Sequence, residues 1–101
     1  MMDLQPIQDA ARQGQLFFTD HVLRQMIKRA ITEAETVEAI LNGEIIEEYP
    51  KDKYGPSCLL SGQTQARRSL HVLCSLPPRI RVITVYQPDP AEWIDDRLRR
   101  P

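Results

Sequence analysis

The chain has 101 residues, of which 42% are hydrophobic and 27% are charged, a composition typical of a single globular domain spanning residues 1–101 rather than of a disordered chain. No apolar run approaches the ~20 residues of a membrane-spanning helix, and the first residues lack the apolar core of a signal peptide, so we expect a cytoplasmic protein. The formal net charge of −1 excludes a strongly basic nucleic-acid binder, although arginines and lysines gather in blocks that allow a local basic patch.

The first predicted element is a short amphipathic helix within residues 1–15, beginning near Pro6 and ending at Gly14. Residues 16–18 then form a short apolar connector. A second helix is predicted after Thr19, a suitable N-cap, with Asp20 in its first turn. On a helical wheel one side of this helix is apolar and the opposite side is polar and basic; the apolar side holds Val22, Leu23, Met26 and Ile27, and the polar side holds His21, Arg24, Gln25 and Lys28.

A third helix is predicted to begin with a capping box, in which Thr32 caps the helix and Glu35 reaches back to it. Asn42 and Gly43 supply its C-terminal stop. We expect one stripe of this helix to be buried, formed by Ala34, Val37, Ala39, Ile40 and Leu41. Together the second and third helices form a hairpin that can cover a sheet.

Four strands are predicted next. Residues 44–49 alternate Ile and Glu, a pattern suited to an edge strand, and residues 57–61 form the second strand. Residues 69–75 and 80–86 flank Pro77-Pro78 as a central hairpin. An even connection would place Val72 opposite Ile83 and Leu70 opposite Val85. His71, Thr84 and Tyr86 would then gather at one end of the other face, an arrangement that suits a ligand.

After Pro88, residues 91–98 predict a short C-terminal helix containing Trp93. The predicted fold class is therefore α+β, with N-terminal helices packed on one face of a four-stranded antiparallel sheet and a short C-terminal helix.

Several polar residues could do chemistry: histidine and tyrosine can act as a base or an acid, and arginine and lysine can neutralise a phosphate. The candidate catalytic residues are His71, Tyr86 and His21; the candidate phosphate-binding residues are Arg24, Lys28, Arg67 and Arg68. Five of these also have a structural interpretation: a hydrogen-bonded packing residue for His71, a structural role for Tyr86, a helix-start contact for His21, and a solvated helix face for Arg24 and Lys28.

Several segments resemble one bacterial family. They are His21-x-x-Arg24-x-Met26-x-x-Arg29, Gly43-Glu44-Ile45-Ile46-Glu47-x-Tyr49-Pro50, Tyr54-Gly55-Pro56-Ser57-Cys58, Leu70-His71-Val72, and Ile83-Thr84-Val85-Tyr86-x-Pro88-Asp89-Pro90-x-x-Trp93. In this order and at these spacings, from Phe18 to Trp93, they are similar to the family named domain of unknown function 4258. One position departs from the family pattern, because Ser69 stands where members usually have proline.

The resemblance implies a distant similarity to BrnT- and RelE-type toxins, which are small α+β proteins that cut RNA without metal. It also implies a partner, a small zinc-finger protein similar to the MqsA/YgiT antitoxins. We therefore expect the toxin-like component of a toxin–antitoxin pair, acting as a metal-independent endoribonuclease. The alternative is a non-catalytic module that binds protein or RNA. No cofactor is expected, and a metal site at His71 and Cys74 has unsuitable spacing for a strand.

Overall fold

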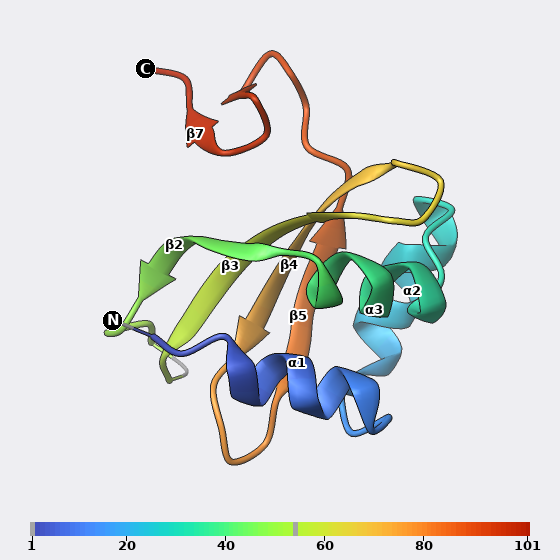
Figure 1. Ribbon diagram of the computed structural model, residues 1–101, viewed down its shortest axis with the longest axis vertical. Helices are drawn as coiled ribbons and strands as arrows, with labels where there is room; N and C mark the ends of the chain where they lie inside the picture. The colour runs from blue at the N-terminus through green and yellow to red at the C-terminus, as the bar shows by residue number, and fades with distance from the viewer. Residues whose placement is uncertain (1, 54) are drawn as a thin grey trace.

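The computed structural model describes residues 2–53 and 55–101, so Tyr54 of the family-like pattern lies outside the described residues. Within them the chain forms an α+β fold with three helices, a five-stranded mixed sheet and a separate two-stranded sheet (Figure 1). The elements are α1 (Gln5–Arg12), β1 (Phe17–Phe18), α2 (Asp20–Lys28), α3 (Glu33–Leu41), β2 (Glu44–Tyr49), β3 (Ser57–Gln63), β4 (Ser69–Ser75), β5 (Arg81–Tyr86), β6 (Trp93–Ile94) and β7 (Leu98–Arg99).

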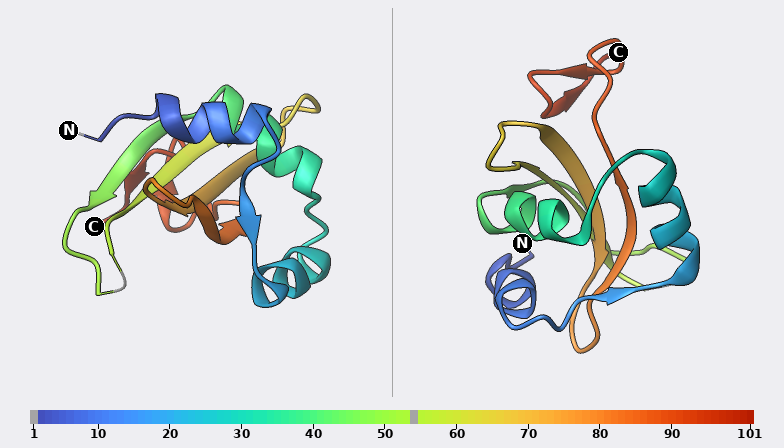
Figure 2. Two further views of the ribbon diagram at one scale, coloured as in Figure 1. Left: turned by 90° about the horizontal axis from the view of Figure 1, so that it is seen from below. Right: turned by 90° about the vertical axis from the view of Figure 1, so that its right-hand side faces the viewer.

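The large sheet has the strand order β1-β5-β4-β3-β2, so β2 is an edge strand as predicted. Helices α1 and α3 cover one face of this sheet, and α2 lies beside β5 at the other end of the strand order (Figure 2). None of the described helices has the length and apolarity to cross a membrane. The helices and the covered face enclose one apolar core, which includes Ile7, Val22, Met26, Ile40, Leu60, Leu70, Val72, Val82 and Val85.

Both predicted N-caps are confirmed. The Thr19 hydroxyl accepts a hydrogen bond from the Val22 amide at 3.2 Å. Thr32 and Glu35 make both bonds of the capping box, which satisfies donors that a helix start otherwise leaves unpaired. These caps fix where α2 and α3 begin and therefore which residues they turn toward the sheet.

The predicted apolar helix faces are correct only in part. Val22 and Met26 are buried, whereas Ile27 is 78% exposed, because α2 lies at the end of the sheet and packs along a narrow stripe beside β5. In α3, Ala34 is exposed and Thr36 is buried instead. Thr36 tolerates burial because its hydroxyl donates to the Thr32 carbonyl at 3.0 Å.

Helix α3 contacts β3 at backbone level through Gly62. A Cβ atom at this position would lie 1.9 Å from the Ala39 carbonyl oxygen, so any other residue would force the helix away from the strand. Helix and sheet therefore approach closely because Gly62 has no side chain.

The predicted four-stranded antiparallel sheet is wrong in one respect, because residues 17–18 form a fifth strand. The strand β1 pairs in parallel with β5, with Phe17 opposite Arg81 and Phe18 opposite Val82. Two residues are too few to show the alternation that predicts a strand. Only their tertiary partner, β5, defines them as one.

The predicted C-terminal helix is also wrong. Residues 93–94 and 98–99 form the antiparallel pair β6 and β7. Between them Asp95 and Asp96 adopt φ angles of 52° and 60°, the left-handed conformation that turns a chain back and that aspartate tolerates better than most residues. Trp93 is buried against the sheet, so this large apolar side chain is removed from water without a helix.

The predicted register of the central hairpin is wrong by two residues. Val72 lies opposite Val85 rather than Ile83, and the pairing shifts between Leu73 and Cys74, where Cys74 lies opposite Val82. Such a β-bulge places one extra residue on a strand. Both Val82 and Val85 consequently face the core, and Ile83 is 38% exposed.

Candidate functional site

The face of the sheet turned away from α1 and α3, which we call the outer face, is hollow. Its pocket has a volume of ≈ 610 Å³, within the range typical of ligand sites. We call this the outer pocket; it is lined by Glu48, Tyr49, Pro50, Lys51, Asp52, Leu59, Leu73, Thr84, Tyr86 and Arg99. Leu59 and Leu73 come from the two central strands, so the sheet supplies an apolar floor.

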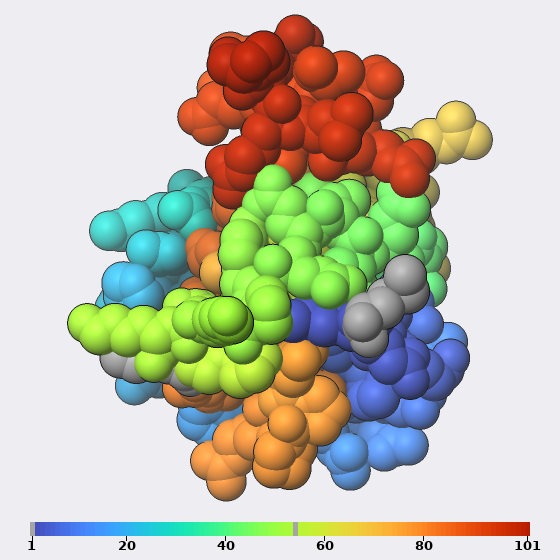
Figure 3. All heavy atoms as spheres, turned by 90° about the vertical axis from the view of Figure 1, so that its left-hand side faces the viewer, coloured from blue at the N-terminus to red at the C-terminus, as the bar shows by residue number. Residues whose placement is uncertain are grey.

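Three segments form the walls of this hollow. The β2–β3 hairpin and α2 descend on opposite sides of the sheet, away from α1 and α3 (Figure 2, left). The C-terminal segment, residues 88–101, lies across the end at which β5 finishes. In Figure 3 the hairpin projects below the C-terminal segment, and atoms of β5 are visible in the hollow between them. The outer face is therefore concave, with strand side chains at its base.

His71 lies next to the outer pocket but is completely buried. Its ring makes T-shaped contacts with the rings of Trp93, at a centroid distance of 4.5 Å, and Tyr86, at 5.3 Å. Its Nε2 atom lies 2.6 Å from the Asp96 carbonyl oxygen, and its Nδ1 atom lies 3.2 Å from the Tyr86 hydroxyl. The C-terminal segment thus covers His71, and both ring nitrogens have partners.

These partners define the protonation of neutral His71. A carbonyl oxygen can only accept, so Nε2 carries the hydrogen and donates it to Asp96. Nδ1 then accepts from the Tyr86 hydroxyl. Burial lowers the pKa of His71, and this effect outweighs the hydrogen bond to Asp96 that raises it. Burial likewise raises the pKa of Tyr86. Near neutral pH the pair is therefore an uncharged tyrosine donating to an uncharged histidine.

A second polar cluster holds the C-terminal segment against β2. Arg99 donates to both carboxylate oxygens of Glu47, from Nε at 2.8 Å and from a terminal nitrogen at 3.2 Å. The Tyr49 hydroxyl also donates to Glu47. Burial alone would raise the pKa of Glu47, but the hydrogen bonds from Arg99 and Tyr49 lower it overall. Arg99 also lies 4.6 Å above the Trp93 ring, so this side chain joins β2, the C-terminal segment and the rim of the pocket.

Arg29, at the end of α2, contacts a residue of the pocket lining. Its Nη1 atom donates to the Thr84 hydroxyl at 3.2 Å and to the Val85 carbonyl at 2.8 Å. Thr84 itself lines the outer pocket. Arg29 belongs to the family-like pattern in the sequence, but nothing in that pattern indicates that it reaches β5.

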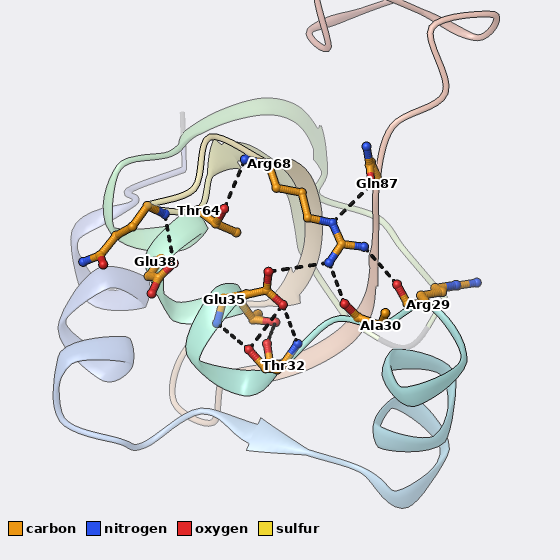
Figure 4. A network of polar contacts seen from close by, with 10 residues as sticks. Arg29, Ala30, Thr32, Glu35, Glu38, Thr64, Arg68 and Gln87 are labelled. Atoms are coloured by element: carbon orange, nitrogen blue, oxygen red, sulfur yellow. Dashed lines mark hydrogen bonds and ion pairs between the residues drawn. The ribbon is translucent and has the colours of Figure 1, made fainter.

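The predicted phosphate-binding Arg68 lies in a different network, shown in Figure 4. Its guanidinium donates to the backbone carbonyls of Arg29 and Ala30 and to the Gln87 side chain, and it forms an ion pair with Glu35 at 3.5 Å. Ala30 has a φ of 55°. Arg68 thus fastens the turn after α2 to the sheet, and its hydrogen-bonding groups are largely engaged there.

The remaining predicted residues are exposed and lie apart from His71. His21, Arg24 and Lys28 lie on the surface of α2, where His21 Nε2 is 3.2 Å from the Gln25 side chain. Arg67 is exposed in the turn between β3 and β4 with a φ of 65°. The structure therefore brings His71 and Tyr86 together, as predicted from strand alternation. Tyr49 and Arg99, not the predicted basic residues, line the pocket with Tyr86.

His71 and Cys74 lie on opposite faces of β4, because Cys74 belongs to the core. They cannot share a metal ion. Among the described residues, no three His, Cys, Asp or Glu side chains gather in a way that could hold one. Burial also raises the pKa of both cysteines, that of Cys58 to about 11, so these thiols are packing groups.

Comparison with known proteins gives one match. The family model described as "Domain of unknown function (DUF4258)" matches residues 18–87, the region from β1 to the residue after β5. Neither the curated proteins nor the solved structures contain a match to this chain. The matched region includes the floor of the outer pocket and ends before the C-terminal segment that covers His71.

Proposed function

Since the chain belongs to the family of the domain of unknown function DUF4258, whose description assigns no activity, we propose from the site itself that it is a module that binds single-stranded RNA in the outer pocket. The observation that carries this proposal is the lining of the pocket. Tyr49 and Tyr86 line it together with Leu59 and Leu73, which form its apolar floor. Unpaired bases stack on aromatic side chains in this kind of site, and each such contact contributes about 1–3 kcal/mol.

The two tyrosines are held in place before any ligand arrives. The Tyr86 hydroxyl is engaged by His71, and the Tyr49 hydroxyl is engaged by Glu47. Their rings therefore present fixed apolar surfaces, and little side-chain entropy remains to be lost on binding. Fixed rings favour a flat ligand.

Cations from three elements surround this aromatic site. Lys51 comes from the β2–β3 hairpin and Arg99 from the C-terminal segment, and both line the pocket. Arg29 joins from the end of α2 through Thr84. Glu47 balances the charge of Arg99, so phosphates on either side of a bound base would depend mainly on Lys51 and Arg29. These cations support RNA as the ligand even though the net charge of the chain is slightly negative.

The test is a titration of a fluorescently labelled, unstructured RNA followed by anisotropy. Thr84→Trp should fill the pocket and weaken binding at least ~10-fold, the loss of about one stacking contact. Gln63→Trp is the matched control, because it adds the same ring at an exposed position on β3 and should leave the affinity unchanged. Absence of RNA binding by the wild type, or equal losses in two folded variants, would overturn the proposal.

A second candidate function is RNA cleavage by a toxin-like component. The observation that favours it is the 3.2 Å contact between Tyr86, which lines the pocket, and His71. In such a reaction the ribose 2′-oxygen loses its proton to solvent water and attacks phosphorus, and the bond from phosphorus to the 5′-oxygen breaks. The leaving 5′-oxygen takes a proton from an acid such as the Tyr86 hydroxyl, which then regains a proton from solvent. The product carries a 2′,3′-cyclic phosphate.

In this second function the chain would be restrained by a small zinc-finger antitoxin-like protein, as the resemblance to BrnT- and RelE-type toxins implies. The test is co-expression with the product of the neighbouring gene followed by co-purification. A stable complex that suppresses a growth defect caused by the chain alone is the expected result. If the chain does not slow growth and purifies without a partner, the toxin function is rejected and RNA binding remains the proposed function.

A further inference from the structure

We propose that the outer pocket selects guanine, recognised through the carboxylate of Asp52; this inference rests on the proposed RNA-binding function. RNA binding alone does not explain why carboxylates line the pocket. The rim of the pocket includes Glu48 and Asp52, and carboxylates repel the phosphates of a nucleic acid. A carboxylate is useful in such a site when it reads a base.

Of the carboxylates near the pocket, Glu47 and Glu48 have other roles. Glu47 accepts from both Arg99 and Tyr49. Glu48 lies opposite Cys58 in the register of β2 and β3, and Cys58 belongs to the core face. The Glu48 carboxylate accepts from the Met2 amide at 3.2 Å, on that same side of the sheet. Glu48 therefore contributes to the edge of the pocket but does not direct its carboxylate at a ligand.

Asp52 differs from both. It lies in the β2–β3 hairpin, which reaches over the outer face: Asp52 lines the outer pocket and also a neighbouring cavity with Thr19 and Arg81 at the far side of the sheet. Its Oδ2 atom accepts from the Ser57 hydroxyl at 3.1 Å, which orients the carboxylate. Among the hydrogen bonds of the described residues, Oδ1 takes none and Oδ2 takes only that from Ser57. Each carboxylate oxygen has two lone pairs, so both oxygens can still accept a hydrogen bond from a ligand.

The Watson–Crick edges of the bases decide which ligand fits. An ionised carboxylate only accepts hydrogen bonds. Guanine presents two adjacent donors, N1–H and the N2 amino group, which match the two oxygens of one carboxylate. Adenine and cytosine each present one donor beside an acceptor, so a second carboxylate oxygen would face a lone pair. Uracil presents one donor between two acceptors. A carboxylate beside a stacking site therefore favours guanine over the other three bases.

The experiment compares four labelled oligouridines that differ only at the central base, which is guanine, adenine, cytosine or uracil. The wild type should bind the guanine oligonucleotide at least ~5-fold more tightly than the others, the discrimination expected of one bidentate contact to a base. Asp52→Asn keeps an amide oxygen for Ser57 but replaces one acceptor by a donor, so it should abolish this preference. Asp9→Asn, an exposed aspartate on α1, should retain it.

The outcomes separate this inference from the function on which it rests. Similar affinity for all four oligonucleotides, or an unchanged guanine preference in Asp52→Asn, would overturn the role of Asp52 while RNA binding stands. Failure of every oligonucleotide to bind would overturn both. Asp52→Ala provides a second variant: it too should lose the preference, and near-ultraviolet circular dichroism would verify that the tyrosine environments are intact.

Discussion

His71 and Tyr86 lie opposite each other on β4 and β5, and Nδ1 of the histidine is 3.2 Å from the tyrosine hydroxyl. The histidine is closed off from solvent by the C-terminal segment, whereas the tyrosine lines the outer pocket. The pair therefore connects the buried support of the site with its accessible surface. A change at His71 acts on the pocket through Tyr86, not by touching a ligand.

His71→Ala should destabilise the fold by ~2–4 kcal/mol. The substitution removes a fully buried ring and leaves the Asp96 carbonyl and the Tyr86 hydroxyl without a partner. Urea denaturation measures the change. His21→Ala is the control and should cost less than ~0.5 kcal/mol, because His21 is exposed on α2. Similar small effects for both variants would show that His71 is not a packing residue.

Stability should also depend on pH through His71. Burial lowers the folded-state pKa of this group below its ordinary value of 6.5, so in mildly acidic solution the unfolded chain binds a proton that the folded chain does not. The free energy of unfolding should therefore be highest above the ordinary pKa and should decrease as the pH falls through that value toward the folded-state pKa.

The measurement is urea denaturation at about pH 7, about pH 6 and about pH 5, a window above the range in which most carboxylates titrate. His71→Gln should remove most of the dependence on pH, whereas His21→Gln should retain it. A wild-type stability that rises on acidification would contradict the predicted direction.

Arg67 and Arg68 are adjacent in the chain but should differ in how much each contributes to stability. Arg68→Ala should cost ~1.5–3 kcal/mol, because its guanidinium donates to carbonyls at the turn after α2 and its ion pair with Glu35 is mostly shielded. Arg67→Ala should leave stability within ~0.5 kcal/mol. Thermal or urea denaturation of both variants checks this. A larger loss for Arg67 would contradict the assignment.

The elements that sequence predicts well are those with local signals. The caps at Thr19 and Thr32 depend on hydrogen bonds to residues three positions later, so the residue types that form them can be recognised in the sequence. The strand β1 has no such signal, because it is defined by its pairing with the distant β5. The pair β6 and β7 is a very short hairpin, and its Trp93 packs against the distant His71. For the same reason, Arg99 joins the site through a partner 52 residues away, and Arg29 through one 55 residues away.

Strand alternation explains both what was predictable at the site and what was not. It places His71 and Tyr86 on one face, and the structure confirms that they meet. It cannot anticipate a bulge, which changes the face of every residue on one side of it. Because of the bulge, the core receives Val82 where unbroken alternation would place Ile83.

The bulge yields a stability prediction for adjacent residues on β5. Val82→Ala should cost about 2 kcal/mol, because Val82 is 1% exposed and its truncation leaves a cavity. Ile83→Ala removes a larger side chain but should cost under ~1 kcal/mol, since this residue is 38% exposed. Chemical denaturation of the two variants in parallel measures the difference. A larger loss of stability for Ile83→Ala than for Val82→Ala would indicate an unbroken register and contradict the bulge.

The final prediction separates RNA binding from RNA cleavage at Tyr86. Tyr86→Phe keeps the ring that lines the outer pocket and removes only the hydroxyl that bonds to His71. If the chain only binds RNA, this variant should keep its affinity within about twofold, because stacking depends on the ring. If the chain cleaves RNA, the same variant should lose ~10²-fold or more in rate, the usual contribution of a positioned acid or base, with affinity again retained.

Single-turnover cleavage of a labelled RNA, with detection of 2′,3′-cyclic phosphate ends, distinguishes RNA binding from RNA cleavage. Wild-type protein that binds RNA and yields no such ends, with or without ribosomes, would exclude cleavage and leave His71 as the buried support of a binding surface.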